Sequence, residues 1–214
     1  MEETEEIKQM KKEQRLKEIE NEKNQIPEIL QFEQWTKMKY KEILFDSNVY
    51  KWGILDPTFY TSIFNKQNLI FLIEDENNIK FGGFISTKID KYISYDINGN
   101  GKGIYDPKCF LFSFKNNQPI KYELRKDKEI NSTFLLFESN DDKLFVFGRR
   151  DIFIKKSNWK SFCFDDINEC YFDYKGKEKA LNGKSGLQQN DEFEIKILIV
   201  IQMEHNESKS IKTK

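Results

Sequence analysis

The amino-acid sequence predicts an α+β protein that is mainly β: a two-sheet antiparallel β-sandwich with a few short helices, preceded by an N-terminal helix. Two observations lead to this fold class. Aromatic residues make up 14% of the 214 residues, including 19 Phe and nine Tyr, and flat rings fit the pleated, half-buried surface of a sheet. In addition, about eight to ten short apolar or alternating runs follow one another, separated by polar turns, as strands do.

Residues 1–26 are predicted to form a charged helix that precedes the sandwich. This segment is rich in Glu, Lys and Gln and contains no Gly or Pro, so its helix propensity is high. Its core heptad positions are Leu16, Ile19, Lys23, Ile26 and Leu30, and extending the pattern back adds Lys12 and Gln9. Because three of these residues are polar, two alternatives remain: a solvated single helix, or a short coiled coil through which the chain self-associates.

The sandwich domain is predicted to span residues 27–204, with a disordered tail over residues 205–214. It begins with a second helix, because Pro27 suits a first helical turn and the apolar residues that follow keep to one face, which we expect to dock on the domain. From Ile43 the hydrophobic period changes to that of a strand. Asp56-Pro-Thr then supplies the capping residue and the proline of another helix start.

A hairpin over residues 69–87 is expected to organise the sheets. It consists of a continuous apolar run, a polar turn and a second run that contains Gly82 and Gly83. Glycine weakens the interior of a strand, so the pair implies a bulge, a bend or a close contact, and we expect it to bend the strand where the sheets meet. Further strands are expected over residues 92–95, 109–114, 121–124, 133–138, 143–148, 151–155, 160–164 and 192–201.

The charge pattern restricts the class of partner and the compartment. Charged residues reach 33% but leave a net charge of -1, which gives no general attraction to nucleic acid or to an acidic membrane. The acidic start does not resemble a signal peptide, and no apolar run reaches the ~18 residues of a membrane span. We therefore expect a cytoplasmic protein without membrane insertion. The odd number of cysteines, Cys109, Cys163 and Cys170, argues against a disulfide framework.

The sequence predicts no enzyme, no cofactor and no metal centre. The only histidine, His205, lies in the polar tail, which excludes histidine triads and most histidine-ligated metal sites. Residues 96–101, beginning with Asp96, match the first half of a calcium loop, but the position that requires a bidentate Glu is Pro107. The alternatives for this segment are a calcium-binding loop and a surface turn.

A protein contact is the function that the remaining candidate residues favour. Trp52 lies in the loop Tyr50-Lys-Trp-Gly, where an exposed Trp would anchor an interface and a buried one would belong to the core. Arg149, Arg150 and Asp151 form part of a basic cluster, which suits an ordinary charged surface or a protein contact better than nucleic acid.

The order of five motifs resembles the TLDc domain family of oxidation-resistance and related proteins. Together the motifs cover residues 35–203, and their Asp46, Ser47, Gly82, Gly83 and Gly148 form a structural signature. The motifs are Ile43-Leu-Phe-Asp-Ser, Phe81-Gly-Gly-Phe-Ile, Cys109-Phe-Leu-Phe-Ser-Phe, Phe147-Gly-Arg-Arg-Asp-Ile and Phe193-Glu-Ile-Lys-Ile-Leu-Ile-Val.

The resemblance implies a β-sandwich without established catalytic machinery, a role in protection against oxidative stress, and binding to the vacuolar proton-pumping ATPase. Two segments depart from the family pattern: Tyr105-Asp-Pro-Lys replaces a frequent Gly-Thr-Gly-Glu, and residues 171–179 replace a Gly-rich segment. The hypothesis is a non-catalytic protein-interaction module. The alternatives are a redox-responsive protein that acts through the thiol of Cys109 or Cys163, and a nucleic-acid-binding regulator.

Overall fold

The computed structural model describes ten stretches of the chain, which belong to two compact units. Unit 1 comprises residues 1–42 and 203–214, and unit 2 comprises residues 43–202. The predicted boundary at residue 26 therefore falls inside unit 1. The described residues are 5–50, 57–95, 101–115, 118–127, 130–148, 150–156, 159–163, 170–171, 181–182 and 192–206.

Unit 1 contains the two N-terminal helices, α1 (Glu5–Gln25) and α2 (Glu28–Thr36), and the start of strand β1 (Lys39–Asp46). Pro27 opens α2 as expected, and Lys37 closes it with a left-handed φ of 60° and an N–H that donates to the Glu33 carbonyl. Along the predicted heptad seam, Leu16 is exposed and Ile26 is buried. Self-association through α1 and docking of α2 on the sandwich both stay predictions.

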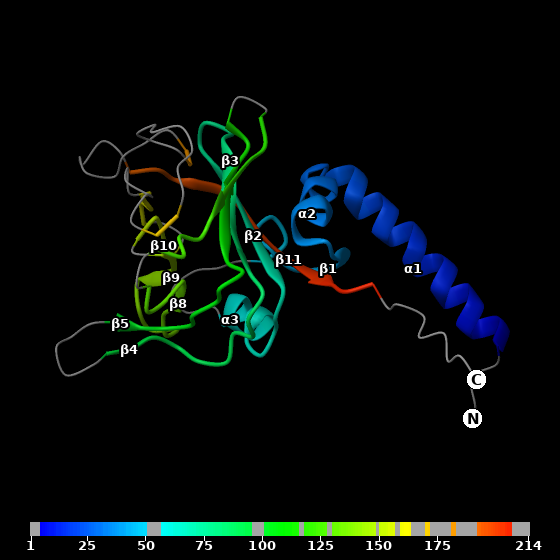
Figure 1. The fold of residues 1–214 in the computed structure, drawn as a ribbon. Coiled ribbons are helices and arrows are strands. Elements are labelled where there is room, and N and C mark those ends of the chain that lie inside the picture. The colour runs from blue at the N-terminus through cyan, green and yellow to red at the C-terminus, as the bar shows by residue number, and fades with distance from the viewer. Residues whose placement is uncertain are drawn as a thin grey trace. The chain divides into compact units, whose positions relative to one another are not determined.

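Unit 2 is an antiparallel β-sandwich (Figure 1), as the sequence predicts. The large sheet has the order β1-β11-β2-β3-β6-β7, the small sheet has the order β10-β9-β8, and β4 and β5 form a separate ribbon. The elements that follow β1 are α3 (Thr58–Ile63), β2 (Leu69–Asp75), β3 (Lys80–Ile85), β4 (Ser94–Tyr95), β5 (Gly101–Lys102), β6 (Phe110–Ser113), β7 (Ile120–Glu123), β8 (Phe134–Leu136), β9 (Lys143–Phe147), β10 (Ile152–Lys155) and β11 (Ile195–Glu204).

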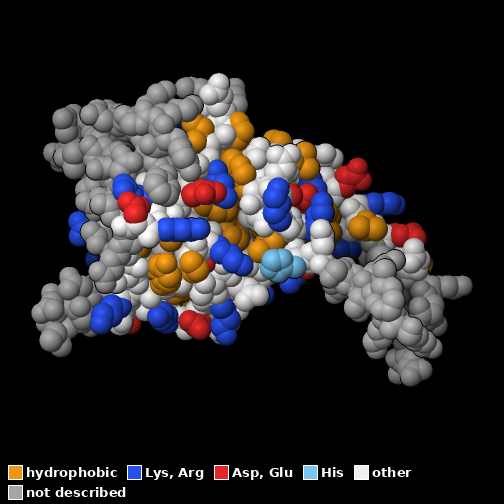
Figure 2. Space-filling view, in the orientation of Figure 1, with side chains coloured by type: hydrophobic (Ala, Val, Ile, Leu, Met, Phe, Trp, Pro, Cys, Tyr) orange, Lys and Arg blue, Asp and Glu red, His pale blue; other side chains and the backbone are white. Residues whose placement is uncertain are grey.

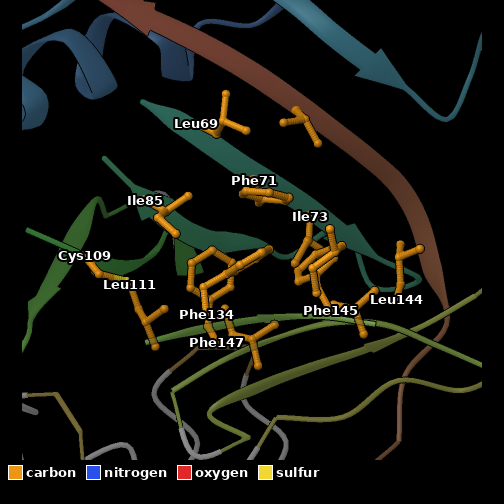
Figure 3. Close-up of a cluster of buried hydrophobic side chains, with 14 of the residues drawn as sticks. Leu69, Phe71, Ile73, Ile85, Cys109, Leu111, Phe134, Leu144, Phe145 and Phe147 are labelled. Carbon is orange, nitrogen blue, oxygen red and sulfur yellow. The ribbon is translucent and has the colours of Figure 1, made fainter. Parts of the chain in front are cut away.

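The core of unit 2 lies between the two sheets and packs a cluster of aromatic rings among aliphatic side chains (Figure 3). Phe71 of β2 lies 5.2 Å from the ring of Phe134, 4.9 Å from that of Phe145 and 5.5 Å from that of Phe147, measured between ring centroids. All four side chains are fully buried. On the visible surface, in contrast, Lys and Arg alternate with Asp and Glu around small apolar areas (Figure 2).

Gly82 and Gly83 of β3 serve close packing. The strand pairs with β2 and β6 in continuous register through both glycines, so no bulge interrupts it there. A Cβ on Gly83 would lie 2.7 Å from the Phe147 ring, and a Cβ on Gly82 would lie 1.8 Å from the Phe71 carbonyl oxygen. Of the possibilities that glycine in a strand implies, these distances support close contact, and the expected bend of the strand stays a prediction.

Several predicted boundaries differ from those of the structure. The helix expected at Asp56 begins at Thr58, and Asp56 itself lies outside the described residues. The last strand was expected from residue 192, but β11 begins at Ile195 because Phe193 pairs instead with Ser161 beside the small sheet, before a register shift between Ile195 and Ile197. In the described part of the chain, no helix is long and apolar enough to cross a membrane.

Candidate functional site

A loop that follows β5 presents Tyr105 on the surface of unit 2, where 51% of this side chain is exposed. The next residue, Asp106, is fully buried. Its carboxylate accepts hydrogen bonds from the Ser86 amide, the Ser86 hydroxyl (2.8 Å), the Thr87 amide (3.2 Å) and the Lys108 amide (2.9 Å). Because a charged acceptor with several donors fixes backbone geometry, the loop holds Tyr105 in one position.

The turn between β9 and β10 presents Arg150, which is exposed and has a left-handed φ of 76°. Gly148 also has a positive φ, of 61°, and a Cβ on it would lie 1.7 Å from the Asp151 carboxylate. Glycine is thus required there both by conformation and by space. Since a left-handed arginine is strained, the surrounding structure must hold the turn in place.

Thr133 joins these two segments, which are far apart in the sequence. Its buried hydroxyl accepts a hydrogen bond from the Asp106 amide at 2.9 Å, and its carbonyl accepts one from the Gly148 amide at 2.9 Å. Its own amide donates to the Ile104 carbonyl at 2.8 Å. The Tyr105 loop and the Arg150 turn therefore lie side by side and share one anchor. We call Tyr105, Lys108 and Arg150 the loop surface.

Beneath the loop surface lies a buried contact between Cys109 and Tyr171. The thiol and the phenol oxygen are 3.3 Å apart, and the Cys109 amide donates to the Asp106 carbonyl at 3.1 Å. A Cβ on Gly148 would come within 3.0 Å of the Tyr171 ring. Burial and the neighbouring Cys109 and Asp151 raise the pKa of the Tyr171 phenol, so Tyr171 is neutral and supports the two loops from below.

All three cysteines are free thiols in the interior. Burial raises the pKa of the Cys109 thiol well above its usual value, although the hydrogen bond with Tyr171 opposes this. Burial and the carboxylates of Asp151 and Asp75 raise the pKa of the Cys163 thiol. Since the thiolate is the reactive form, both thiols are poorly suited to direct reaction with an oxidant.

The predicted site residues lie in different environments. Trp52 and Arg149 are outside the described residues, as is most of the suggested calcium loop at residues 96–100. Arg150 is exposed, whereas Asp151 is only 1% exposed and lies in the interior. Within the described stretches, no group of three or more His, Cys, Asp and Glu side chains could hold a metal ion.

The signature residues Asp46 and Ser47 shape the turn after β1. The Asp46 carboxylate accepts a hydrogen bond from the Asn48 amide at 2.8 Å. Ser47 connects the turn to β11, since its amide donates to the Leu198 carbonyl at 2.9 Å and its hydroxyl accepts from the Leu198 amide at 2.9 Å. Both residues therefore stabilise the sandwich.

No sequence pattern marked Tyr105, Lys108 or Thr133 as site residues. The Asp-Pro pair at Asp106 could have indicated a turn that displays its neighbours. No local pattern, by contrast, indicates that Thr133 anchors two loops. Its hydrogen-bond partners are distant in the sequence, because Asp106 lies 27 residues before it and Gly148 lies 15 residues after it.

The fold and the loop surface define a class of protein: an antiparallel β-sandwich domain that displays aromatic and basic side chains on two anchored loops. The family model of the TLDc domain matches residues 16–202, which is most of the chain. The chain therefore belongs to the TLDc family, as the five motifs indicated. A search of curated proteins found no relative of this chain.

Proposed function

We propose that the chain is a non-catalytic protein-interaction module of the TLDc type. The observation that carries this proposal is the pairing of exposed Tyr105 with exposed Arg150 on loops that share the anchor Thr133. Tyrosine and arginine are enriched among the residues that dominate binding energy at interfaces. Loops that are already fixed lose little conformational entropy on binding, which favours affinity.

The partner that we propose first is the vacuolar proton-pumping ATPase, and the setting is the cytoplasm. Resemblance to the TLDc family supports this choice. The same resemblance supports a role in protection against oxidative stress. In this proposal protection follows from partner binding. Direct thiol chemistry is the competing mechanism, and the raised pKa values of Cys109 and Cys163 disfavour it because few thiolates form near neutral pH.

A pull-down with the full chain tests partner binding. Detergent-solubilised vacuolar membranes supply the ATPase, and immunoblotting measures how much of it the bait retains. Replacing both Tyr105→Ala and Arg150→Ala should lower retention about tenfold or more, since each is expected to remove at least ~1 kcal/mol of binding energy.

The matched control replaces Trp159→Ala and Lys160→Ala. These residues are also an exposed aromatic and an exposed basic side chain, with Trp159 50% exposed, but they lie beyond the opposite end of β10 from the Arg150 turn. Equal retention by the wild-type chain and the Tyr105/Arg150 variant would remove the loop surface from the proposed function, and so would an equal loss in the control.

A second experiment separates partner binding from thiol chemistry. All three cysteines are replaced by alanine, and cells that express the variant are challenged with peroxide. If protection comes through a partner, it should persist in proportion to the amount of folded protein, which thermal unfolding of the purified variant measures. Loss of protection by a variant that still folds and still retains the partner would instead support the thiol alternative.

A further inference from the structure

We infer that the loop surface binds an acidic segment of its protein partner, with carboxylates against Arg150 and Lys108 and an apolar side chain against Tyr105. This inference rests on the proposed function and adds the chemistry of the partner. It follows from the way in which the fold distributes charge between the surface and the interior at this place, and from the geometry of the two loops.

The segments that build the loop surface carry both signs of charge, but only the basic side chains are exposed. These segments are residues 86–88, 103–109, 132–133, 148 and 150–151. Their acidic residues, Asp106 and Asp151, are 0% and 1% exposed. Their basic residues, Lys88, Lys108 and Arg150, are all exposed.

This separation of charge has a structural cause. The Asp106 carboxylate is turned inward because the amides of Ser86, Thr87 and Lys108 and the Ser86 hydroxyl donate to it. Asp151 is turned inward beneath Gly148, whose missing Cβ leaves room for the carboxylate. Among the described residues of these segments, the exposed charge is thus basic, on a chain whose net charge is -1. Asp90, two residues after Lys88, is exposed but does not balance three basic groups.

The geometry of Arg150 favours a carboxylate as its partner. A guanidinium group binds a carboxylate through two parallel hydrogen bonds. The left-handed φ of 76° at Arg150 fixes the point from which the side chain leaves the turn. Because Asp151 is buried, it is not placed to satisfy an exposed guanidinium in the way that an exposed neighbouring acid would.

Tyr105 favours a protein segment over a small anion. Its half-exposed ring offers apolar contact area, and the phenol offers a hydrogen bond at its rim. A free phosphate would use the basic groups and leave the ring without a contact. An acidic peptide that also carries Leu or Phe would use both. Single-stranded nucleic acid could also combine stacking with basic contacts, so it is included in the test.

The test measures binding of fluorescent twelve-residue peptides to the full chain by anisotropy. One peptide alternates Glu and Asp with Leu and Phe, and its matched counterpart has Gln and Asn in place of the acids. We expect the acidic peptide to bind, its affinity to fall with added salt, and the neutral counterpart to bind at least tenfold more weakly. Replacing Lys108→Gln and Arg150→Gln should lower the affinity for the acidic peptide about tenfold or more.

The control variant Lys155→Gln and Lys160→Gln removes the same charge at the opposite end of β10 and just beyond it, and should leave the affinity nearly unchanged. The inference is overturned if the neutral peptide binds as tightly as the acidic one, or if the control variant loses as much affinity as the Lys108/Arg150 variant. It is also overturned if a single-stranded DNA twelve-mer binds more tightly and with the same sensitivity to Lys108 and Arg150.

A third variant, Tyr105→Ala, tests the apolar contact, because it keeps all charges. It should lower the affinity for the acidic peptide, and an unchanged affinity contradicts the apolar contact.

The two proposals fail in different ways. If the Tyr105/Arg150 variant loses the partner in the pull-down but no acidic peptide binds, the interaction surface stands and the inferred chemistry is wrong. If the acidic peptide binds at Lys108 and Arg150 but the pull-down is insensitive to the surface, the chemistry stands and the proposed partner function is wrong.

Discussion

The two units of the chain are stabilised by different kinds of contact. In unit 1 the carboxylate of Glu33 accepts hydrogen bonds from Lys23 at 2.7 Å, the Tyr40 amide at 3.0 Å and Lys39 at 3.3 Å. The Tyr40 hydroxyl in turn donates to Glu22 of α1. A single acidic residue of α2 therefore connects both helices to the beginning of β1.

Unit 2 relies on aromatic packing. The rings of Phe71, Phe134, Phe145 and Phe147 contact one another between the sheets (Figure 3). Burial of apolar surface does not depend on the protonation of any group, whereas a hub of ion pairs does. The two units should therefore respond to different perturbations: unit 2 to changes of side-chain volume in its core, and unit 1 to pH.

The largest effect is expected for Phe71→Ala in the middle of the aromatic core. Removing a fully buried ring that contacts three others leaves a cavity and should lower the free energy of unfolding by about 3–5 kcal/mol. Urea denaturation measures the change, with Phe71→Leu as a milder control. A loss below about 1 kcal/mol would mean that aromatic packing is not what stabilises unit 2.

An intermediate effect is expected for Gly83→Val. The new side chain would meet the Phe147 ring, since even a Cβ would lie 2.7 Å from it, and overpacking of this kind costs about 1–3 kcal/mol. The loss is again measured by urea denaturation. Phe147→Leu should recover part of it in the double variant. Additive losses would show that the two positions do not compete for space.

An effect of comparable size, and the one that should depend on pH, is expected for Glu33→Gln. Burial alone would raise the pKa of Glu33, but the hydrogen bonds from Lys23, the Tyr40 amide and Lys39 hold it below its usual value of 4.5. The stabilisation is therefore complete above pH 4.5 and is lost as the pH falls below that value through the lowered pKa. At pH 7 the substitution should cost unit 1 about 1.5–3 kcal/mol.

Hydrogen-exchange protection of the α1 amides measures this loss locally. The difference between Glu33→Gln and the wild-type chain should shrink as the pH is lowered below 4.5. Glu18→Gln is the control, because the pair of Glu18 with Arg15, at 3.4 Å, is largely exposed and should contribute less than about 1 kcal/mol. Equal losses for the two variants would contradict the role of Glu33 as the hub.

The sequence predicted much of the sandwich but less of the candidate site. The hairpin of β2 and β3 and that of β8 and β9 were predicted because their apolar runs and polar turns are local patterns. Of the predicted interaction residues, Arg150 is exposed, whereas its neighbour Asp151 is buried, and a protein contact at Arg150 stays a prediction. The basic cluster in the sequence gave no sign that one of its members turns inward, because that depends on the space beneath Gly148.

The sequence by itself determined the fold class, the family and the positions of most strands, since hydrophobic periodicity, turn residues and the glycines of β3 act over a few residues. Only the tertiary structure decided that Tyr105 and Arg150 share the anchor Thr133, and that the thiols of Cys109 and Cys163 are enclosed. The physical reason is that these features arise from contacts between segments distant in the chain, where each partner's position depends on the packing of both sheets.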